Sequence, residues 1–392
     1  MNPTVSAAGI PAIPGPAKAQ DSLTDARKGA AAGVSGGGSS AGAAVPAQPT
    51  PPHDRDWDAV ADLVGAASRI DLFAHVNPDG DALGSALAVG LALRALGRDV
   101  HVSYGDDPLV VPTSLRFLPG QDLLVPPHEV PDAPDLVMVF DAAGSSRLGL
   151  LEAKAKAARA LVVVDHHASN TRFGTHHIID VAAPATAVLA EELVYRLGGT
   201  LTADIATALY TGLVTDTGSF KYPATTPETH AMAARLLATG IPHADISRAI
   251  WDTCRFGYLK VLSGALAEAR LDAAAAGGLG LVWTVVTRTD RHAHGIALDE
   301  IEGIIDVVRK AAEAEVALVL KEDDDGRLQA SARSKGRVDL GKVCAALGGG
   351  GHAFAAGYTA RDETPGQVVA RFRALLADAR LPSPADPADA AG

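Results

Sequence analysis

The stretch ALVVVDHHASNTRFG, residues 160–174, joins an apolar run to a group of ionisable side chains. Its first five residues form a short continuous apolar run, which is typical of a strand buried on both faces. Asp165, His166 and His167 follow where this strand would end. Two imidazoles and a carboxylate in such a place can bind a metal, orient a phosphate or cap a turn. The rest of the chain has to decide among these roles.

Comparable apolar runs recur before this stretch, with helical patterning between them. They are RIDLFAHV (69–76), DVHVSY (99–104) and DLVMVFDAA (135–143). Strands separated by helices indicate a parallel sheet with both faces covered. We therefore predict an α/β protein. A parallel-sheet N-terminal domain would precede a smaller α/β C-terminal domain, and an active-site cleft would lie between them.

Composition divides the chain into five predicted parts. The first segment is rich in Ala, Gly, Pro and Ser, and it offers too little apolar surface to offset the entropy of ordering. The predicted parts are a disordered tail (1–54), the first domain (55–253), a connecting helix or linker (254–276), the second domain (277–381) and a second disordered tail (382–392).

The bulk composition excludes several classes of protein. The net charge is −12, which argues against broad binding to long duplex nucleic acid. No apolar run reaches the length of a membrane span, so we expect no membrane association. The two cysteines give no disulfide framework and no cysteine metal site. The simplest expectation is a cytoplasmic location.

Ionisable side chains stand at four element ends in the first domain, and three of the four groups follow an apolar strand directly. Because ligands bind beyond the carboxyl ends of parallel strands, the fold would bring these groups together. The groups are His75 with Asp79 and Asp81, then Asp141, then Asp165 with His166 and His167, and lastly Asp216.

Several carboxylates in one crevice repel one another unless cations compensate their charge. A mixture of imidazole and carboxylate suits Mn²⁺ or another first-row metal better than Mg²⁺, which prefers oxygen ligands. The ligands are too many for one ion. We therefore predict two Mn²⁺ ions, for which Mg²⁺ or Co²⁺ would be substitutes, in the manner of two-metal phosphoester hydrolysis.

The motifs together resemble those of the DHH phosphoesterase superfamily. HVNPDGDALGS (75–85), VFDAA (139–143), DHHASNTRFG (165–174) and TDTGSF (215–220) are similar to its successive metal motifs. GGGGHAFAAG (348–357) is similar to the signature of the DHH-associated domain. The spacing and domain order most resemble the bacterial nanoRNase/pAp (3′-phosphoadenosine-5′-phosphate) phosphatase branch.

The resemblance implies a role for each residue of the first domain. One metal would be held by His75, Asp79 and Asp141, and the other by Asp81, Asp141, His166 and Asp216. Asp141 would be the shared, catalytic ligand. His167 would face the substrate phosphate, and Asp165 would orient the imidazoles or only cap the strand.

The second domain would contribute substrate recognition. Its glycine run, with Gly349, Gly350 and Gly351, permits close approach of the backbone to an anion. His352 follows directly and can reach a phosphate or a base. The resemblance places Arg333 and Ser334 at the terminal phosphate or nucleotide of the substrate.

The resemblance implies a metal-dependent phosphodiesterase and phosphatase. It would hydrolyse short RNA or DNA oligonucleotides, including pApA, to nucleoside 5′-monophosphates, and pAp to AMP. One alternative is a phosphodiesterase for cyclic di-AMP. Another, of a different class, is a nucleotide-sensing module that binds without cleaving, although the complete ligand set argues against it. The resemblance is also compatible with a homodimer.

Overall fold

The computed structural model of the protein describes residues 52–381. The predicted C-terminal tail and all but the last three residues of the predicted N-terminal tail lie outside this range. Helix α1 begins at Asp54, so the first ordered element starts slightly earlier than the sequence suggested.

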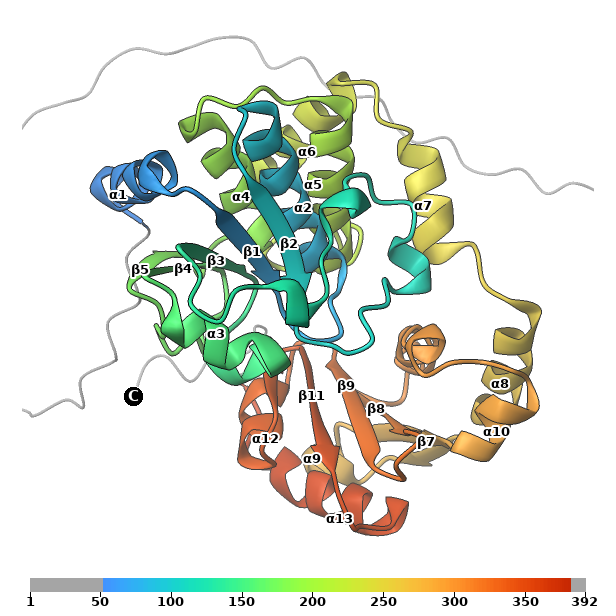
Figure 1. Ribbon diagram of the computed structural model, residues 1–392. Coiled ribbons are helices and arrows are strands. Elements are labelled where there is room, and N and C mark those ends of the chain that lie inside the picture. The colour runs from blue at the N-terminus through green and yellow to red at the C-terminus, as the bar shows by residue number, and fades with distance from the viewer. Residues whose placement is uncertain (1–51, 382–392) are drawn as a thin grey trace, which may run out of the picture. The chain divides into compact units, whose positions relative to one another are not determined.

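The first sheet confirms the predicted parallel architecture (Figure 1). Its five strands lie in the order β2-β1-β3-β4-β5, and every neighbouring pair is parallel. Strands β1 to β4 are short and almost wholly buried, as their apolar runs predicted; the edge strand β5 is half buried and was not predicted. They are β1 (Ile70–Ala74), β2 (Val100–Tyr104), β3 (Leu136–Phe140), β4 (Ala160–Asp165) and β5 (His176–Ile179).

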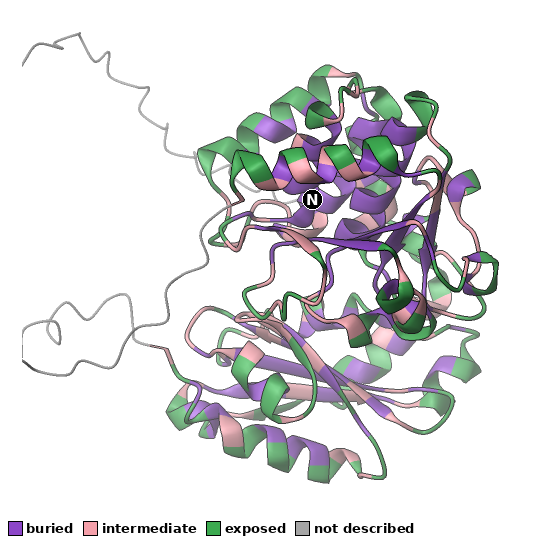
Figure 2. Cartoon of the chain, turned by 60° about the vertical axis from the view of Figure 1, so that its left-hand side comes forward, coloured by how far each residue is buried: buried purple, intermediate pink, exposed green. Residues whose placement is uncertain are grey.

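Apolar side chains cover both faces of this sheet. Figure 2 colours the strands at its centre as buried. Alternate strand residues pack against helices on one face and against the short helix α3 (Glu152–Ala157) and its preceding turn on the other. The other helices of this domain are α1 (Asp54–Ala66), α2 (Gly80–Ala95), α4 (Thr186–Arg196), α5 (Ala203–Asp216), α6 (Pro227–Ala238) and α7 (His243–Trp251).

Helices α2 and α5 approach each other closely because glycines face the contact. A Cβ atom added to Gly84 of α2 would lie 2.5 Å from the carbonyl oxygen of Ala208 in α5. A Cβ atom on Gly212 of α5 would lie 2.7 Å from Oδ1 of Asp81 in α2. Any larger residue would force the helices apart. This packing brings the N-terminus of α2 close to the last turns of α5.

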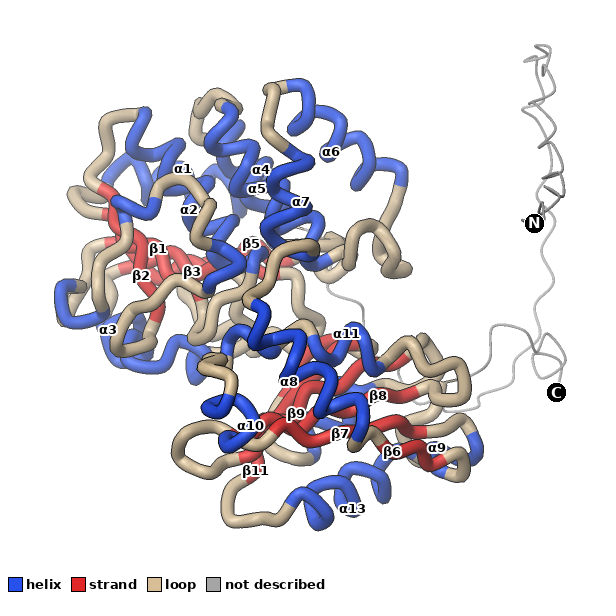
Figure 3. The backbone as a smooth tube through the Cα atoms, turned by 90° about the vertical axis from the view of Figure 1, so that its right-hand side faces the viewer, coloured by secondary structure: helices blue, strands red, loops and turns tan. Residues whose placement is uncertain are grey.

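The second sheet is mixed, with the order β10-β11-β9-β8-β7-β6 (Figure 3). Only β7 and β8 pair in parallel, and the other neighbours are antiparallel. Its strands are β6 (Arg270–Asp272), β7 (Leu281–Val286), β8 (Val316–Glu322), β9 (Leu328–Ser334), β10 (Gly350–His352) and β11 (Ala355–Ala360).

The helices of this second half are α8 (Phe256–Ala267), α9 (Ala275–Gly278), α10 (Arg288–Ala293), α11 (Ile304–Val308), α12 (Leu340–Ala346) and α13 (Pro365–Leu376). The longest of them are α8 and α13, with 12 residues each. The segment predicted as a connecting helix contains α8, but it also contains the edge strand β6. Within residues 52–381, no helix is both long and apolar enough to cross a membrane.

Candidate metal centre

The strand order places the predicted ligands at one edge of the first sheet. The chain passes from β1 to β2, which lies on one side of β1, and then returns to β3, which lies on the other side of β1. The carboxyl ends of β1 and β3 therefore flank the point where the strand order reverses. Parallel sheets bind ligands at such a point. His75 directly follows β1, Asp141 directly follows β3, and Asp165 ends β4.

Asp79 and Asp81 are fixed by the start of helix α2. Asp79 is its N-cap residue: Oδ1 accepts hydrogen bonds of 3.0 Å from the amides of Asp81 and Ala82, and Oδ2 lies 3.6 Å from Nε2 of His75. Asp81 is buried, and it accepts hydrogen bonds from the amides of Thr186 (2.6 Å) and Ala187 (2.8 Å) at the start of α4. The turn-like sequence NPDGD therefore caps one helix and points two carboxylates inward.

Asp216 is the last residue of α5. The helix dipole disfavours a carboxylate at a C-terminal helix end, so this position calls for a compensating cation. Gly218, Ser219 and Phe220 follow with φ angles of 57°, 59° and 63°. Such a left-handed turn costs free energy for the two residues that are not glycine, and strain of this kind is characteristic of functional sites.

The ligand atoms fall into two groups that share Asp141. Those of His75, Asp79 and Asp141 lie within 4.8 Å of one another, and so do those of Asp81, Asp141 and His166. Oδ2 of Asp216 lies 3.2 Å from Nε2 of His166. Asp141 has a φ of 60°, which is unusual for a residue with a side chain and directs its carboxylate between the two groups.

The hydrogen bonds of the imidazoles fix which nitrogen faces the carboxylates. Nδ1 of His166 lies 3.0 Å from the carbonyl of Ala183, to which it must donate, so Nε2 carries a lone pair. This buried Nε2 has no hydrogen-bond partner among the described residues, although it lies 3.2–4.0 Å from three carboxylates. Burial lowers the pKa of His166, but the charges of Asp141 and Asp81 raise it above its usual value. A cation, either a proton on Nε2 or a metal ion bound by its lone pair, is therefore favoured between this nitrogen and the carboxylates.

His75 shows the same arrangement. Its Nδ1 lies 2.8 Å from the carbonyl of Val76 and 3.1 Å from Nη2 of Arg147. One nitrogen cannot donate to the carbonyl and accept from the guanidinium at once. The bond to Val76 is the one that leaves Nε2 free to face Asp79 and Asp141 as a metal ligand.

The electrostatics show that the cluster needs positive charge. Burial lowers the pKa of His75, but hydrogen bonding to Asp141 and Asp79 raises it to about 10. Burial, together with the charge of Asp141, raises the pKa values of Asp81 and Asp216 well above the usual range. Without a metal ion, bound protons therefore supply the positive charge that compensates these carboxylates. The mixture of imidazole and carboxylate ligands fits divalent first-row metal ions.

His167 is held differently from His166. Its Nδ1 bonds to Oδ1 of the fully buried Asp165 at 2.8 Å, and Oδ2 of Asp165 accepts a 2.6 Å bond from Nδ2 of Asn170. Asp165 therefore orients His167 directly, whereas the Nδ1 of His166 bonds to a backbone carbonyl. This arrangement leaves Nε2 of His167 available for a ligand.

One predicted residue of the second domain meets the cluster. The ring of His352 stacks on His167, with centroids 4.2 Å apart and planes inclined by 17°, and its centroid lies 4.9 Å from that of His166. Burial and the charges of His167 and His166 lower the pKa of His352 to about 3. His352 is therefore a neutral imidazole at the site.

The other predicted residues of the second domain differ in their roles. Arg333 has a buried Nε atom with no partner in the described part of the chain, so part of its guanidinium is free for a ligand. Ser334, by contrast, is buried, and its hydroxyl donates a 2.8 Å hydrogen bond to Glu315. It also accepts from the amides of Gly336 and Val338. Ser334 thus supports a turn and offers no free group to a phosphate.

The glycine run forms strand β10 and its approach. A Cβ atom on Gly349 would lie 2.1 Å from the carbonyl of Gly357, and Gly351 has a φ of 134°. Gly350 has open space around it and is exposed. Two of the three predicted glycines are thus required by the β10–β11 hairpin itself.

Three further residues at the site were not singled out from the sequence. Thr186 donates a 2.9 Å hydrogen bond from its hydroxyl to Oδ1 of Asp141. Asn170 holds Asp165, and Arg147 faces His75. The position of Thr186 at the start of a helix was the available signal, since helix N-termini bind carboxylates.

Comparison with known proteins identifies both domains of the chain. Residues 69–213 match the family model described as "DHH family, N-terminal domain", and residues 282–379 match the "DHHA1 domain". A Thermus thermophilus protein named "Bifunctional oligoribonuclease and PAP phosphatase NrnA" is 32% identical over 315 residues, covering 79% of this chain and 90% of that protein. The chain belongs to the DHH family.

Two further similarities extend over most of the chain. A Streptococcus mutans protein named "Probable bifunctional oligoribonuclease and PAP phosphatase NrnA" is 27% identical, covering 75% of this chain and 90% of that protein. The crystal structure of an exopolyphosphatase-related protein from Bacteroides fragilis matches with a TM-score of 0.74 at 23% identity, covering 83% and 96% of the two chains. This second likeness confirms the α/β fold.

Proposed function

We propose that the protein is a metal-dependent phosphoesterase that hydrolyses short oligonucleotides to nucleoside 5′-monophosphates and pAp to AMP. The observation that carries this proposal is the pair of ligand groups that share Asp141 at the reversal point of the sheet. The names of the relatives in Thermus and Streptococcus, which span most of this chain, support the class of substrate.

In this proposal, His75, Asp79 and Asp141 hold one Mn²⁺ ion. Asp81, Asp141, His166 and Asp216 hold the other. Such a pair of ions supplies an activated water and stabilises charge on the phosphoryl group. The free lone pair on His166, the shared position of Asp141 and the helix-end position of Asp216 support these assignments.

The remaining residues position the substrate. His167, fixed by Asp165, presents its Nε2 to the phosphate that is cleaved, where it can donate a hydrogen bond or a proton. His352 stacks on His167 and borders the same space. Arg333 binds a second phosphate of the substrate, because a guanidinium matches phosphate oxygens in geometry and charge. Within this proposal, Ser334 acts only by holding the turn that follows Arg333.

A comparison of turnover on several substrates tests the proposal. The full chain would be assayed with Mn²⁺, with Mg²⁺ and with EDTA on pAp, pApA, a five-nucleotide RNA, cyclic di-AMP and a long single strand. We expect metal-dependent release of nucleoside 5′-monophosphates from the first three. A preference for cyclic di-AMP over all of these would assign the cyclic substrate instead. If the protein bound nucleotides but hydrolysed none of them, it would instead be a nucleotide-sensing module.

A further inference from the structure

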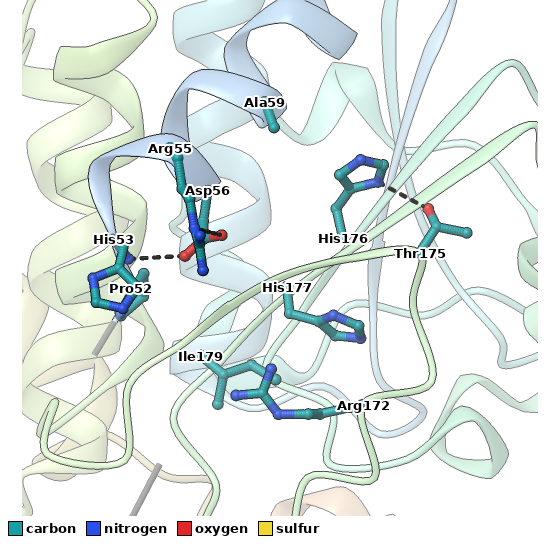
Figure 4. Close-up of a pocket in the computed structure, with 10 residues that line it drawn as sticks. All are labelled: Pro52, His53, Arg55, Asp56, Ala59, Arg172, Thr175, His176, His177 and Ile179. Carbon is teal, nitrogen blue, oxygen red and sulfur yellow. Dashed lines mark hydrogen bonds and ion pairs between the residues drawn. The ribbon is translucent and has the colours of Figure 1, made fainter. Parts of the chain in front are cut away.

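A cavity lies apart from the metal centre, on the free edge of the first sheet (Figure 4). It has a volume of about 320 Å³, which lies at the small end of the range for ligand pockets. Strand β5 is the edge strand, and the consecutive residues His176 and His177 both line the cavity. Consecutive strand residues point to opposite faces, so the cavity spans the edge itself. The start of α1 and the loop before β5 complete its wall.

The lining of this edge cavity is rich in basic groups. Its ionisable groups comprise two guanidiniums, three imidazoles and a single carboxylate, from Arg55, Arg172, His53, His176, His177 and Asp56. The carboxylate accepts a 2.9 Å hydrogen bond from the amide of His53 and lies 3.8 Å from Nε of Arg55. Arg172 forms no ion pair with any residue in 52–381. This concentration of positive charge occurs in a chain whose net charge is −12.

One side chain in the cavity has an unmet hydrogen-bonding requirement. Nε2 of His177 is buried and has no partner among the described residues. Burial lowers the pKa of His177; a hydrogen bond to the backbone of Arg172 opposes this shift, and the neighbouring charges of Arg172 and His176 add to it. An anion bound beside these groups would relieve their mutual repulsion and accept a hydrogen bond from the imidazole.

The edge cavity is linked to the metal centre by a short loop. Arg172 lies five residues after His167, and its amide donates a 2.7 Å hydrogen bond to Oδ1 of Asn170. Nδ2 of the same Asn170 donates to Asp165, which in turn holds His167. Arg172 also has a φ of 53°, so its backbone is held in an unusual conformation. The loop therefore fixes Arg172 and His167 relative to each other.

We propose that this edge cavity is a phosphate-binding site for nucleotides, separate from the site of hydrolysis. Guanidinium and imidazole groups around a small cavity can recognise phosphate. Among the described residues, the imidazoles and the carboxylate of this cavity form no group close enough to hold a metal ion. Two kinds of ligand carry a phosphate that these groups would bind in the same way. It is either a distal phosphate of an oligonucleotide whose other end lies at the metal centre, or that of a free nucleoside monophosphate. The first source rests on the proposed function, and the second does not.

The test uses the full chain and the double variant Arg55→Ala/Arg172→Ala. Arg361→Ala is the matched control, because Arg361 is an exposed arginine outside the cavity lining. Calorimetric titrations with AMP and with adenosine measure free-nucleotide binding, and KM on a five-nucleotide RNA and on pAp measures the contribution to the substrate. Turnover of bis-p-nitrophenyl phosphate should remain unchanged in both variants, since neither alters the metal centre.

The two sources of phosphate give different results. For a free nucleotide, the parent protein should show an AMP-binding event that adenosine does not produce and that the double variant weakens about tenfold or more. For a substrate phosphate, the double variant should instead raise KM for the five-nucleotide RNA about tenfold or more and leave KM for pAp unchanged. If AMP binding and both KM values are the same in parent, double variant and control, the edge cavity is not a phosphate site. The AMP arm remains decisive even if the protein hydrolyses no oligonucleotide.

Discussion

Two neighbouring histidines at the metal centre are held by different partners. Nδ1 of His166 bonds to the backbone carbonyl of Ala183, and Nδ1 of His167 bonds to the carboxylate of Asp165. His166→Ala should therefore lose bound Mn²⁺. His167→Ala should retain the metal and turn over slowly, because phosphate positioning or proton delivery is lost. Metal analysis of the purified variants, alongside their rates on pAp, checks this difference; equal metal loss in both would refute it.

Arg333 offers a second test at the scale of the residue. Arg333→Ala should keep the metal content and change the melting temperature little, since the side chain loses only the 3.0 Å hydrogen bond from Nη1 to the carbonyl of Ala332. Its kcat/KM on pAp should fall about 10²-fold if one charge-assisted contact of about 2–3 kcal/mol is removed. Hydrolysis of bis-p-nitrophenyl phosphate, which offers no second phosphate, should fall much less. Similar losses on both substrates would show that Arg333 serves the chemistry or the fold.

The sequence predicted which residues gather at the sheet edge, but it did not predict all of their partners. His75, Asp141 and Asp165 come together because parallel strands carry them to one edge, and the apolar runs reveal those strands. The hydroxyl of Ser334 bonds to Glu315, which is nineteen residues away in the chain. No pattern in the neighbouring sequence predicts such a contact. Residues that depend on distant partners were therefore the ones whose surroundings could not be predicted.

At the scale of the element, the close approach of α2 and α5 positions Asp81 and Asp216 together. Gly84→Ala would place a Cβ atom 2.5 Å from the carbonyl of Ala208. Because backbone cannot move aside cheaply, we expect a loss of about 1–3 kcal/mol in the free energy of unfolding. Metal affinity should fall as well, since the two carboxylates move apart. Thermal and denaturant unfolding, with and without Mn²⁺, measure both effects.

Gly264→Ala in helix α8 is the matched control for this change. A Cβ atom there meets nothing within 4 Å. Removing a glycine from a helix interior without a clash should raise the free energy of unfolding by up to about 1 kcal/mol. If Gly84→Ala and Gly264→Ala had the same effect, close packing of α2 on α5 would not be what positions the ligands.

At the scale of the element, strands could be predicted where their burial leaves a simple apolar pattern in the sequence. Strands β1 to β4 of the first sheet are largely buried, so their apolar runs identified them, whereas the half-buried edge strand β5 was missed. Strand β6 was missed within the predicted linker because it is a three-residue edge strand, mostly exposed, with no apolar run. The apolar spacing of residues 298–312 is typical of a single helix, but this stretch forms only α11 and a short 3₁₀ turn (Asp299–Ile301).

At the scale of the whole molecule, metal binding should be coupled to pH. In the metal-free protein the pKa of His75 is raised to about 10, so this imidazole carries a proton at neutral pH. Mn²⁺ must displace that proton, and those of Asp81 and Asp216 if present. Mn²⁺ affinity should therefore rise with pH from about 6 toward 10. Calorimetry in buffers of different ionisation enthalpy should show proton release on binding; no dependence on the buffer would contradict this coupling.

The central claim is that one carboxylate, Asp141, is shared by two bound metal ions. The most direct measurement is the number of Mn²⁺ ions retained per chain after gel filtration, by elemental analysis, for the parent and for Asp141→Asn. We predict close to two ions in the parent. In the variant we predict well under one ion, with a melting temperature in EDTA close to that of the parent. Two ions retained by Asp141→Asn, or no more than one in the parent, would contradict the account.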